Sequence, residues 1–454
     1  MQFRKVDIVQ SSENGALFES LEPAIFERDP AAENRVINLY PEVEFQKIIG
    51  FGGAFTETSA YQFSRMSAKT KDKIVKLYFD PKAGLGYNFC RTHIHSCDFS
   101  LNRYTYVDDE DKELKTFSVE RDRKYILPFI KAAKKAAGKD LWLFASPWSP
   151  PSWMKSNGDM CHGGRLLDEY YGTWAKYFVR YLQEYKKEGI TFFGLTIQNE
   201  AIAWQTWESC VYTAKEEAVF VHKFLKPALK AAGFDDVKIM IWDHNKERVY
   251  ERARDSFAVP GAKDDIWGVA FHWYSGQHFD ALELTHNAFP DKPLILTEFS
   301  VGERYGETAP APHTSWKGMS IYANELIGDF NHHMAAETMW NLLVDETGGP
   351  YHDRTGGSRA QIVVDPEKDE IFIEPTYYAI AHFSRFVKRG AVRIGTSCFS
   401  DSIDVTAFKN PGGEVVAVAL NHGAETEELR LRIEAVTAQV KLPGHSLTTF
   451  VIPV

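Results

Sequence analysis

Short apolar segments and longer amphipathic segments alternate eight times between residues 46 and 388. The apolar segments are rich in β-branched and aromatic residues, which is typical of strands buried on both faces of a parallel sheet. These predicted strands cover residues 48–55, 87–96, 141–146, 192–200, 237–244, 266–274, 293–299 and 335–343. Helical patterns lie between them, at 67–79, 121–137, 166–188 and 213–233, after residues 246, 279 and 315, and at 375–388.

Eight such alternations predict a (β/α)₈ barrel over residues 46–388, with its active site at the carboxyl ends of the strands. A doubly wound open sheet is the alternative. That fold normally has a glycine-rich phosphate turn after its first strand, and GFGGAF at 50–55 lacks the GxGxxG spacing. The barrel is therefore the favoured fold.

The two ends of the chain have a different pattern. Residues 389–454 contain alternating segments such as IDVTAF and EVVAVAL, separated by turns such as NPGG. This pattern predicts antiparallel strands. Residues 1–45 show no helical period, so we expect them to join the same module, an appended β-sandwich domain.

Composition excludes several classes of protein. The 454 residues carry a net charge of −10, which argues against a nucleic-acid partner. No stretch approaches the ~20 apolar residues of a membrane span. The start MQFRKVDIVQ has no apolar signal core, and the five cysteines are odd in number without a CxxC. We therefore expect a cytoplasmic protein with reduced thiols, or a secreted one if a leader has been removed. The oligomeric state stays open.

Two carboxylates stand at the ends of predicted strands. Glu200 ends the fourth strand and Glu298 ends the seventh. These strands lie across a barrel mouth from each other, so both carboxyls face one cleft. Glycoside hydrolysis uses such a pair: at ~5 Å apart they act with retention, and at ~6.5–9.5 Å with inversion.

Neighbouring residues suggest how the two roles divide. Asn199 precedes Glu200 and is placed to hydrogen-bond a sugar 2-hydroxyl. Tyr274 ends the sixth strand, beside the seventh, and is expected to donate its hydroxyl to Glu298. A proton donor needs a raised pKa and a nucleophile a low one, so we expect the two environments to differ in this sense.

Other polar and aromatic residues follow strand ends. Trp148 and Trp153 are candidates for stacking on a sugar, with simple packing as the alternative. Asp98 is a candidate partner for sugar hydroxyls, and Trp340 lies at the floor of the predicted cleft. Arg91, inside the second strand, is expected to pair with carboxylates at the barrel mouth. His93 and His95 lack a third ligand, so we predict no metal site and no cofactor.

Together these segments resemble glycoside hydrolase family 30, in its glucosylceramidase-like branch. The matching motifs are GFGGAFTETSA, YNFCRTHIHSCDFSLNRYTY, LFASPWSPPSWMKSNG, TIQNE, VAFHWY and LTEFS, in the family's order along most of the barrel. The resemblance implies a retaining enzyme with a sandwich built from both chain ends.

The resemblance also implies roles for individual residues. Glu200 would be the acid/base and Glu298 the nucleophile. The −1 sugar site would be lined by Asp98, Trp148, Asn199, Tyr274 and Trp340. His272, at the end of the sixth strand, is a further candidate for binding the substrate. A cis peptide bond is expected between Trp340 and Asn341.

This chain departs from the family pattern at several positions that we expect to shape the sugar pocket. Ala201 stands where many relatives have proline, and Met339 where some glucosylceramidases have aspartate. The loop 348–355 also diverges.

The leading interpretation is therefore a retaining β-glycosidase acting on a carbohydrate substrate by double displacement, most simply a β-glucosidase or glucosylceramidase-like enzyme. Alternatives within the family are a β-1,6-glucanase, a β-xylosidase and a β-fucosidase. Alternatives of other classes are a non-catalytic carbohydrate-binding barrel and a metal-dependent barrel hydrolase.

Overall fold

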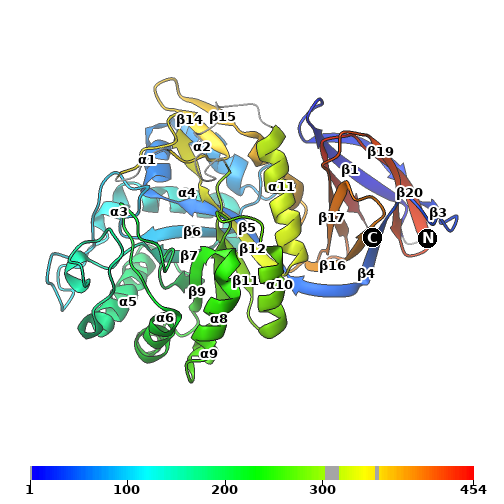
Figure 1. The fold of residues 1–454 in the computed structure, drawn as a ribbon. Helices are drawn as coiled ribbons and strands as arrows, with labels where there is room; N and C mark the ends of the chain where they lie inside the picture. Colours follow the sequence, from blue (N-terminus) through cyan, green and yellow to red (C-terminus); the bar gives the residue numbers. More distant parts are fainter. Residues whose placement is uncertain (1–2, 302–315, 353–356, 454) are drawn as a thin grey trace.

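A closed barrel of eight parallel strands forms the larger part of the molecule (Figure 1). The computed structural model describes residues 3–301, 316–352 and 357–453. In chain order the barrel strands are β5 (Gly50–Phe55), β6 (Phe89–Ile94), β7 (Trp142–Pro147), β8 (Gly194–Thr196), β9 (Lys238–Asn245), β10 (Gly268–His272), β11 (Leu294–Glu298) and β12 (Met334–Asn341). Each strand pairs with the next, and β12 closes the ring on β5.

All eight predicted strands are present, so the (β/α)₈ architecture is confirmed. The fourth is much shorter than predicted. It ends at Thr196, four residues before Glu200, because the chain turns there instead of continuing the ladder with β7 and β9.

Helices surround the barrel (Figure 1). They are α1 (Glu57–Arg65), α2 (Ala68–Phe79), α3 (Glu120–Lys124), α4 (Ile126–Ala137), α5 (Tyr171–Lys187), α6 (Ala214–Phe220), α7 (Lys226–Ala231), α8 (Val249–Phe257), α9 (Ala262–Asp265), α10 (Phe279–Ala288), α11 (Trp316–Asn331) and α12 (Pro375–Ser384). The predicted helix 213–233 is interrupted by a π-helical turn at Val221–Leu225, just before Pro227. Proline supplies no N–H to the helical ladder, which accounts for a break at this point.

The sequence pattern missed α1 because its buried face is largely polar. Glu57, Thr58, Ser59 and Gln62 are all buried, so no apolar period marks the helix. Its N-cap is Thr56, whose side chain accepts a hydrogen bond from the Ser59 N–H.

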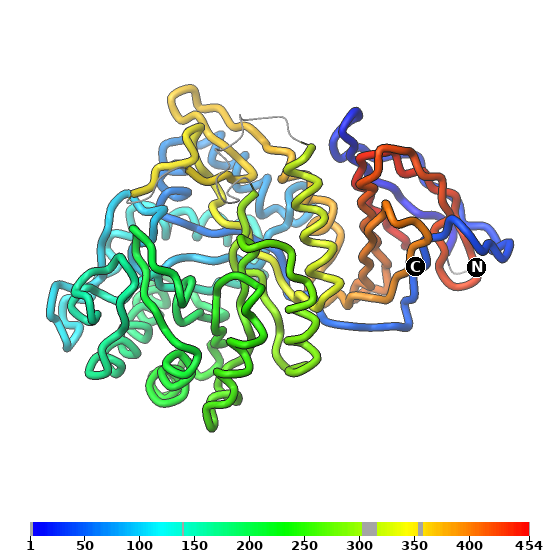
Figure 2. Tube along the Cα trace, in the orientation of Figure 1, coloured from blue at the N-terminus to red at the C-terminus, as the bar shows by residue number. Residues whose placement is uncertain are grey.

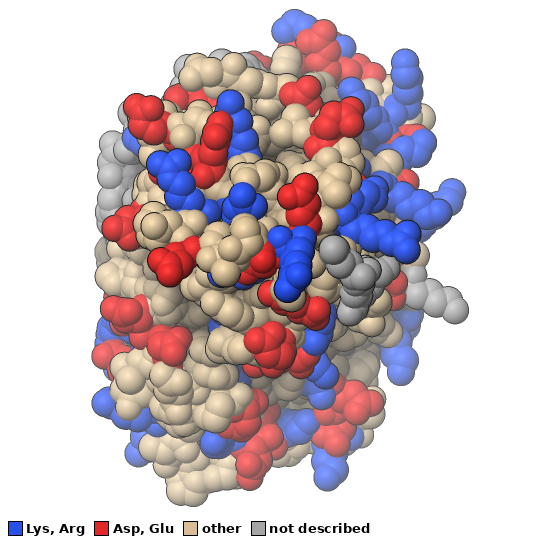
Figure 3. Space-filling model, turned by 90° about the vertical axis from the view of Figure 1, so that its right-hand side faces the viewer, with Lys and Arg blue, Asp and Glu red and all other residues tan. Residues whose placement is uncertain are grey.

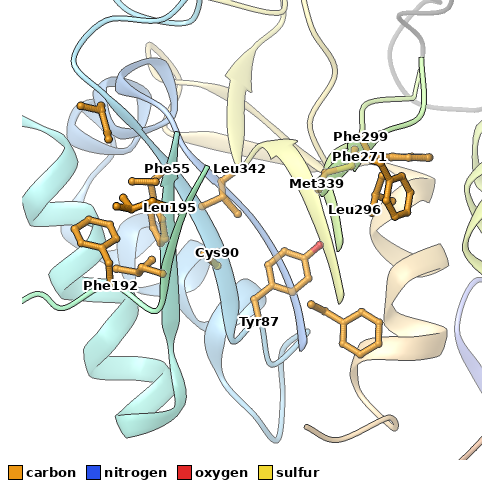
Figure 4. Close-up of a cluster of buried hydrophobic side chains, with 14 of the residues drawn as sticks. Phe55, Tyr87, Cys90, Phe192, Leu195, Phe271, Leu296, Phe299, Met339 and Leu342 are labelled. Carbon is orange, nitrogen blue, oxygen red and sulfur yellow. The ribbon is translucent and has the colours of Figure 1, made fainter. Parts of the chain in front are cut away.

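Two apolar layers hold the barrel together. One fills the barrel interior and includes Phe89, Phe144 and Met240. The other lies between strands and helices (Figure 4). Met339 belongs to this second layer, where Figure 4 shows it near Leu296 and Phe271. It is a buried core residue and is not among the residues that line the cavity described below, so its influence on the sugar pocket stays a prediction.

The second module is a β-sandwich built from both chain ends. Its strands are β1 (Lys5–Ser12), β2 (Glu19–Ile25), β3 (Glu27–Arg28), β4 (Val36–Lys47), β16 (Val392–Cys398), β17 (Ile403–Lys409), β18 (Val415–Asn421), β19 (Glu427–Ile433), β20 (Val436–Leu442) and β21 (Ser446–Ile452). The long strand β4 pairs with β16 and with β19, which links the two layers. Both termini lie in this module (Figure 2).

A small three-stranded sheet is inserted after the last barrel strand. It consists of β13 (Leu343–Asp345), β14 (Ile362–Asp365) and β15 (Glu370–Ile373). Leu343 and Val344 continue the chain directly from β12, so this sheet lies next to the carboxyl end of the barrel, where the candidate site is expected.

The surface is charged but mixed in sign. Figure 3 views the molecule from the sandwich side and shows basic and acidic side chains interspersed, with the densest basic group toward the upper right of the view. Of the helices that the structure describes, none combines the length and apolar character that a membrane crossing requires.

Candidate active site

Glu298 is the last residue of β11 and is buried at the barrel mouth. Its Oε2 lies 2.7 Å from Nη1 of Arg91. Its Oε1 accepts a 2.9 Å hydrogen bond from the Tyr274 hydroxyl, as the order of strands predicted. Both contacts favour the ionised carboxylate.

Glu200 lies in a tight turn beyond β8. Its φ of +50° is in the left-handed region, which a glutamate rarely adopts. The turn is anchored on both sides, because Glu200 N–H donates to the Asp243 carbonyl at 2.8 Å and Asn199 N–H donates to the Pro147 carbonyl at 2.8 Å. Neighbouring barrel strands thus hold a strained turn in place, as is common at functional sites.

Arg91 forms hydrogen bonds on both the Glu200 side and the Glu298 side of the candidate site. Its guanidinium donates to Ser146 Oγ, Asn199 Oδ1, Asp243 Oδ2 and Glu298 Oε2 at 2.7–3.0 Å. Arg91 and Asp243 are both fully buried. The expectation that Arg91 pairs with carboxylates at the barrel mouth is confirmed, and its planar donor geometry fixes several strand ends relative to one another.

Loss of the Arg91 guanidinium is expected to lower the free energy of unfolding. Replacing Arg91 by methionine removes the guanidinium from the buried carboxylate of Asp243, whose remaining ionic contact is with His272, and breaking a buried pair typically costs about 3–5 kcal/mol. Urea unfolding of the variant measures this loss of stability. The matched control is Arg254→Met, which removes an exposed pair with Asp255 and should change the midpoint little. Equal midpoints for both variants would contradict the role assigned to Arg91.

A cavity of about 300 Å³ opens between the two glutamates. Seven of the predicted site residues line it: Asp98, Trp148, Asn199, Glu200, Tyr274, Glu298 and Trp340. The indole rings of Trp148 and Trp340 stack on each other with centroids 5.3 Å apart, above the Arg91 guanidinium. These stacked rings make a rigid apolar wall beside the carboxylates.

The eighth predicted residue, His272, is not among the residues that line the cavity. It is fully buried at the end of β10, with Nδ1 3.6 Å from Glu200 Oε1 and Nε2 3.0 Å from Asp243 Oδ1. The structure thus brings His272 to the carboxylate of Glu200, not to the surface of the cavity.

Several residues of the site were missed by sequence reasoning. Gln205 and Trp207 line the cavity from the loop after Glu200, and His244 and Asn245 line it from the end of β9. The strand-end argument used for Glu200 and Glu298 applies equally to His244 and Asn245 and identifies them. No comparable pattern marks the loop residues.

Burial and neighbouring charges shift the pKa values of this group strongly. Burial raises the pKa of Glu200, but His244 and His272 outweigh it and lower that pKa to about 2. Burial likewise opposes a charge on His272, yet Glu298 and Asp243 raise its pKa to about 9. For Glu298 burial dominates and raises the pKa, against the influence of His272 and Arg91.

These directions are the reverse of the expected order for a proton donor and a nucleophile. The reason is local, because the cationic imidazole of His272 lies beside Glu200 and takes up the proton that the simple picture assigns to the carboxyl. At neutral pH these shifts leave Glu200 ionised and His272 protonated, with Nδ1 of the imidazole 3.6 Å from Glu200 Oε1.

Other predicted features have structural roles. His93 accepts from the Glu57 N–H, and both ring nitrogens of His95 contact protein oxygens, so these side chains are committed to packing. Trp153 packs edge-on against Tyr170. In the part of the chain that the structure describes, Gly349–Pro350 is the cis peptide bond, so the expectation for Trp340–Asn341 is wrong.

The divergent loop 348–355 is described only in part. Residues 353–355 lie outside the described residues. Within the described part, the His352 N–H donates to the Asp98 carbonyl at 3.0 Å, so this segment supports one wall of the cavity.

Comparison with known proteins shows the family. Residues 48–387 match the glycosyl hydrolase family 30 TIM-barrel domain, and residues 390–450 match the beta sandwich domain of the same family. The lysosomal acid glucosylceramidase of Mus musculus is 33% identical over 435 residues, which cover 91% of this chain and 83% of that protein.

Solved structures agree with this match. The crystal structure of SrfJ from Salmonella typhimurium superimposes with a TM-score of 0.94 at 33% identity, covering 98% of this chain and 99% of that one. An endo-β1,6-glucanase superimposes with a TM-score of 0.85 at 28% identity, covering 98% and 99%. By sequence, domain composition and fold, the chain belongs to glycosyl hydrolase family 30.

Proposed function

We propose that this glycoside hydrolase is a retaining β-glycosidase in which Glu298 is the nucleophile and Glu200 the acid/base. The observation that carries the proposal is the shared cavity, with Glu298 held by Arg91 and Tyr274, and with Glu200 Oε1 3.6 Å from Nδ1 of His272. The two carboxyls thus face one cavity, as double displacement requires, and each has its own polar neighbours.

In the first step Glu298 attacks the anomeric carbon while the leaving oxygen receives a proton from Glu200. Arg91 and Tyr274 each engage one oxygen of Glu298, which orients the carboxylate for attack. Asn199 Oδ1 accepts from Arg91, so its amide nitrogen is the end presented to a sugar hydroxyl. A hydrogen bond to the 2-hydroxyl strengthens in the transition state.

In the second step Glu200 takes a proton from water, which attacks the glycosyl-enzyme with net retention. His272, with Nδ1 3.6 Å from Glu200 Oε1, is the proposed source of the proton that Glu200 passes to the leaving group, and it is reprotonated when Glu200 takes a proton from water. His272 in turn is held by Asp243, which Thr196 and Thr297 also contact through their hydroxyls. His272 acts through Glu200 and is therefore a positioning residue.

The substrate we propose is a small β-glucoside cleaved from its non-reducing end. The cavity volume of about 300 Å³ lies at the lower limit of ligand pockets and favours one sugar ring over a bound polymer. The names of the relatives, a glucosylceramidase and an endo-β1,6-glucanase, have a β-glucosyl unit in common.

A reducing compartment fits the cysteines. All five thiols are free, and four of them are buried. A cytoplasmic location stays a prediction, because the Mus musculus relative is named as lysosomal.

Endo-cleavage of β-1,6-glucan is the second candidate, favoured by the structural match to an enzyme of that name.

The deciding experiment is a panel of aryl β-glycosides (glucoside, xyloside, fucoside and galactoside) with gentiobiose and a β-1,6-glucan. We expect turnover of the glucoside and gentiobiose, with β-glucose as the first product by NMR. Release of oligosaccharides from the glucan alone supports endo action, and an α-product contradicts retention. No turnover on any member favours a binding barrel.

A further inference from the structure

Three side chains at the candidate active site form a cluster that hydrolysis alone does not explain. Oε1 of Glu200 lies 3.6 Å from Nδ1 of His244 and 3.6 Å from Nδ1 of His272. Among the described residues this is the group of three metal-ligating side chains whose donor atoms all lie within 4.8 Å of one another. Both Nδ1 atoms are buried, and neither makes a hydrogen bond.

The donor set has the chemistry of a transition-metal site. Two imidazoles and one carboxylate are the protein ligands of many catalytic zinc sites, which keep a fourth position open. With metal–ligand bonds of about 2.0–2.1 Å, tetrahedral donors lie roughly 3.3 Å apart, close to the two 3.6 Å separations. Nitrogen donors favour Zn²⁺, Cu²⁺ or Ni²⁺ over Mg²⁺ or Ca²⁺.

The surroundings of His272 strengthen this assignment. Its second ring nitrogen, Nε2, is 3.0 Å from Asp243 Oδ1. A ligating histidine usually donates its other ring N–H to a carboxylate in this way, which holds one proton on Nε2; an ion that binds Nδ1 displaces the proton from that nitrogen. Asp243 is itself fixed by Arg91, so the ring orientation is set before any ion arrives.

Access to the cluster is through the cavity. Glu200 and His244 both line it, together with Asn245, whereas His272 closes the cluster from behind. An ion held by the three donors therefore has its open position toward the cavity, where water or a sugar hydroxyl completes the coordination.

We propose that Glu200, His244 and His272 form a binding site for a divalent transition metal, and that a bound ion inhibits the enzyme. The metal ion is bound to the carboxylate of Glu200, which transfers the proton in the proposed mechanism. Glu200 therefore cannot donate a proton while the ion is bound. The inhibitory consequence rests on the proposed function. The binding site itself does not, because it requires only the three donors.

Binding is tested first, without reference to activity. Metal-free protein is titrated with ZnCl₂ in a non-chelating buffer by calorimetry, and with CoCl₂ while the visible absorption of four-coordinate Co²⁺ is followed. We expect one site per chain. His244→Asn should weaken Zn²⁺ at least ~10-fold, since even the outer partners of metal ligands are worth 10–100-fold. The control is His422→Asn, which removes an exposed histidine paired with Asp404 and should leave affinity unchanged.

Further results distinguish a variant that does not fold, a metal site that does not exist and a proposed function that is incorrect. His272→Gln serves as a second variant if His244→Asn does not fold, and it too should lose the site. Absence of saturable Zn²⁺ binding to the wild type, or equal affinity in wild type and His244→Asn, overturns the proposal. If the aryl β-glucoside is a substrate, Zn²⁺ should lower kcat, because Glu200 cannot transfer its proton while the ion is bound, and chelation should reverse the effect. If no glycoside is turned over, the titrations still decide whether the metal site exists.

Discussion

Replacing Glu298 by glutamine is expected to lower kcat for an aryl β-glucoside by on the order of 10⁴-fold or more, as removal of a nucleophile does in other enzymes. Glutamine has nearly the same shape: its carbonyl oxygen still accepts from Arg91, whose donor lies 2.7 Å from the carboxylate, and its NH₂ group can donate to the Tyr274 hydroxyl oxygen, 2.9 Å away. It cannot form a stable glycosyl ester. The fold should therefore persist while the first displacement fails.

Activity and folding are measured on the same preparation of Glu298→Gln, by release of the aryl group and by thermal unfolding. The matched control is Glu428→Gln, an exposed glutamate in strand β19 of the sandwich, which should behave as the wild type. A 2-deoxy-2-fluoro β-glucosyl fluoride should add the mass of one sugar to the wild type on the peptide that contains Glu298. Full activity of Glu298→Gln, or a label on another peptide, contradicts its assignment as nucleophile.

The barrel could be predicted because its strands are apolar on both faces and its helices have a clear period. Helix α1 could not, since its buried residues include Glu57 and Gln62, whose burial depends on partners distant in the chain. Glu57, for example, is paired with Arg121, 64 residues away. Hydrophobic periodicity contains no information about such pairs.

At the candidate active site, too, sequence reasoning lacked the interactions between residues that are distant in the chain. Glu298 ends its strand as predicted, but Glu200 lies beyond the end of β8 in a left-handed turn that depends on a hydrogen bond to Asp243. The pKa order was wrong for a related reason. It was argued from the two glutamates and Tyr274 alone, whereas His244 and His272 decide the protonation of Glu200. The effect of a side chain from another strand on the pKa of Glu200 can be judged only when the register of the barrel strands is known.

Replacing Glu200 by glutamine is expected to have an effect that depends on the leaving group. General acid catalysis contributes roughly 10²–10⁴-fold, so hydrolysis of an alkyl β-glucoside should fall by about that factor. A dinitrophenyl β-glucoside needs no protonation to leave, so Glu298 should still be glycosylated. The second step then lacks its base, and we expect a burst of dinitrophenol followed by slow turnover.

Added azide discriminates between the two possible mechanisms for Glu200→Gln. Azide needs no general base, so in a retaining enzyme it should attack the accumulated glycosyl-enzyme, restore turnover and give the β-glycosyl azide. In an inverting enzyme Glu298 would activate water for a single displacement, and azide attacking in place of water would give the α-azide.

Gln205→Ala is the comparison variant, because Gln205 lines the same cavity but has no carboxyl to supply a proton. It should show neither the burst nor rescue by azide. The anomeric configuration of the azide product, read by NMR, therefore tests the role of Glu200 and the retaining mechanism in one measurement.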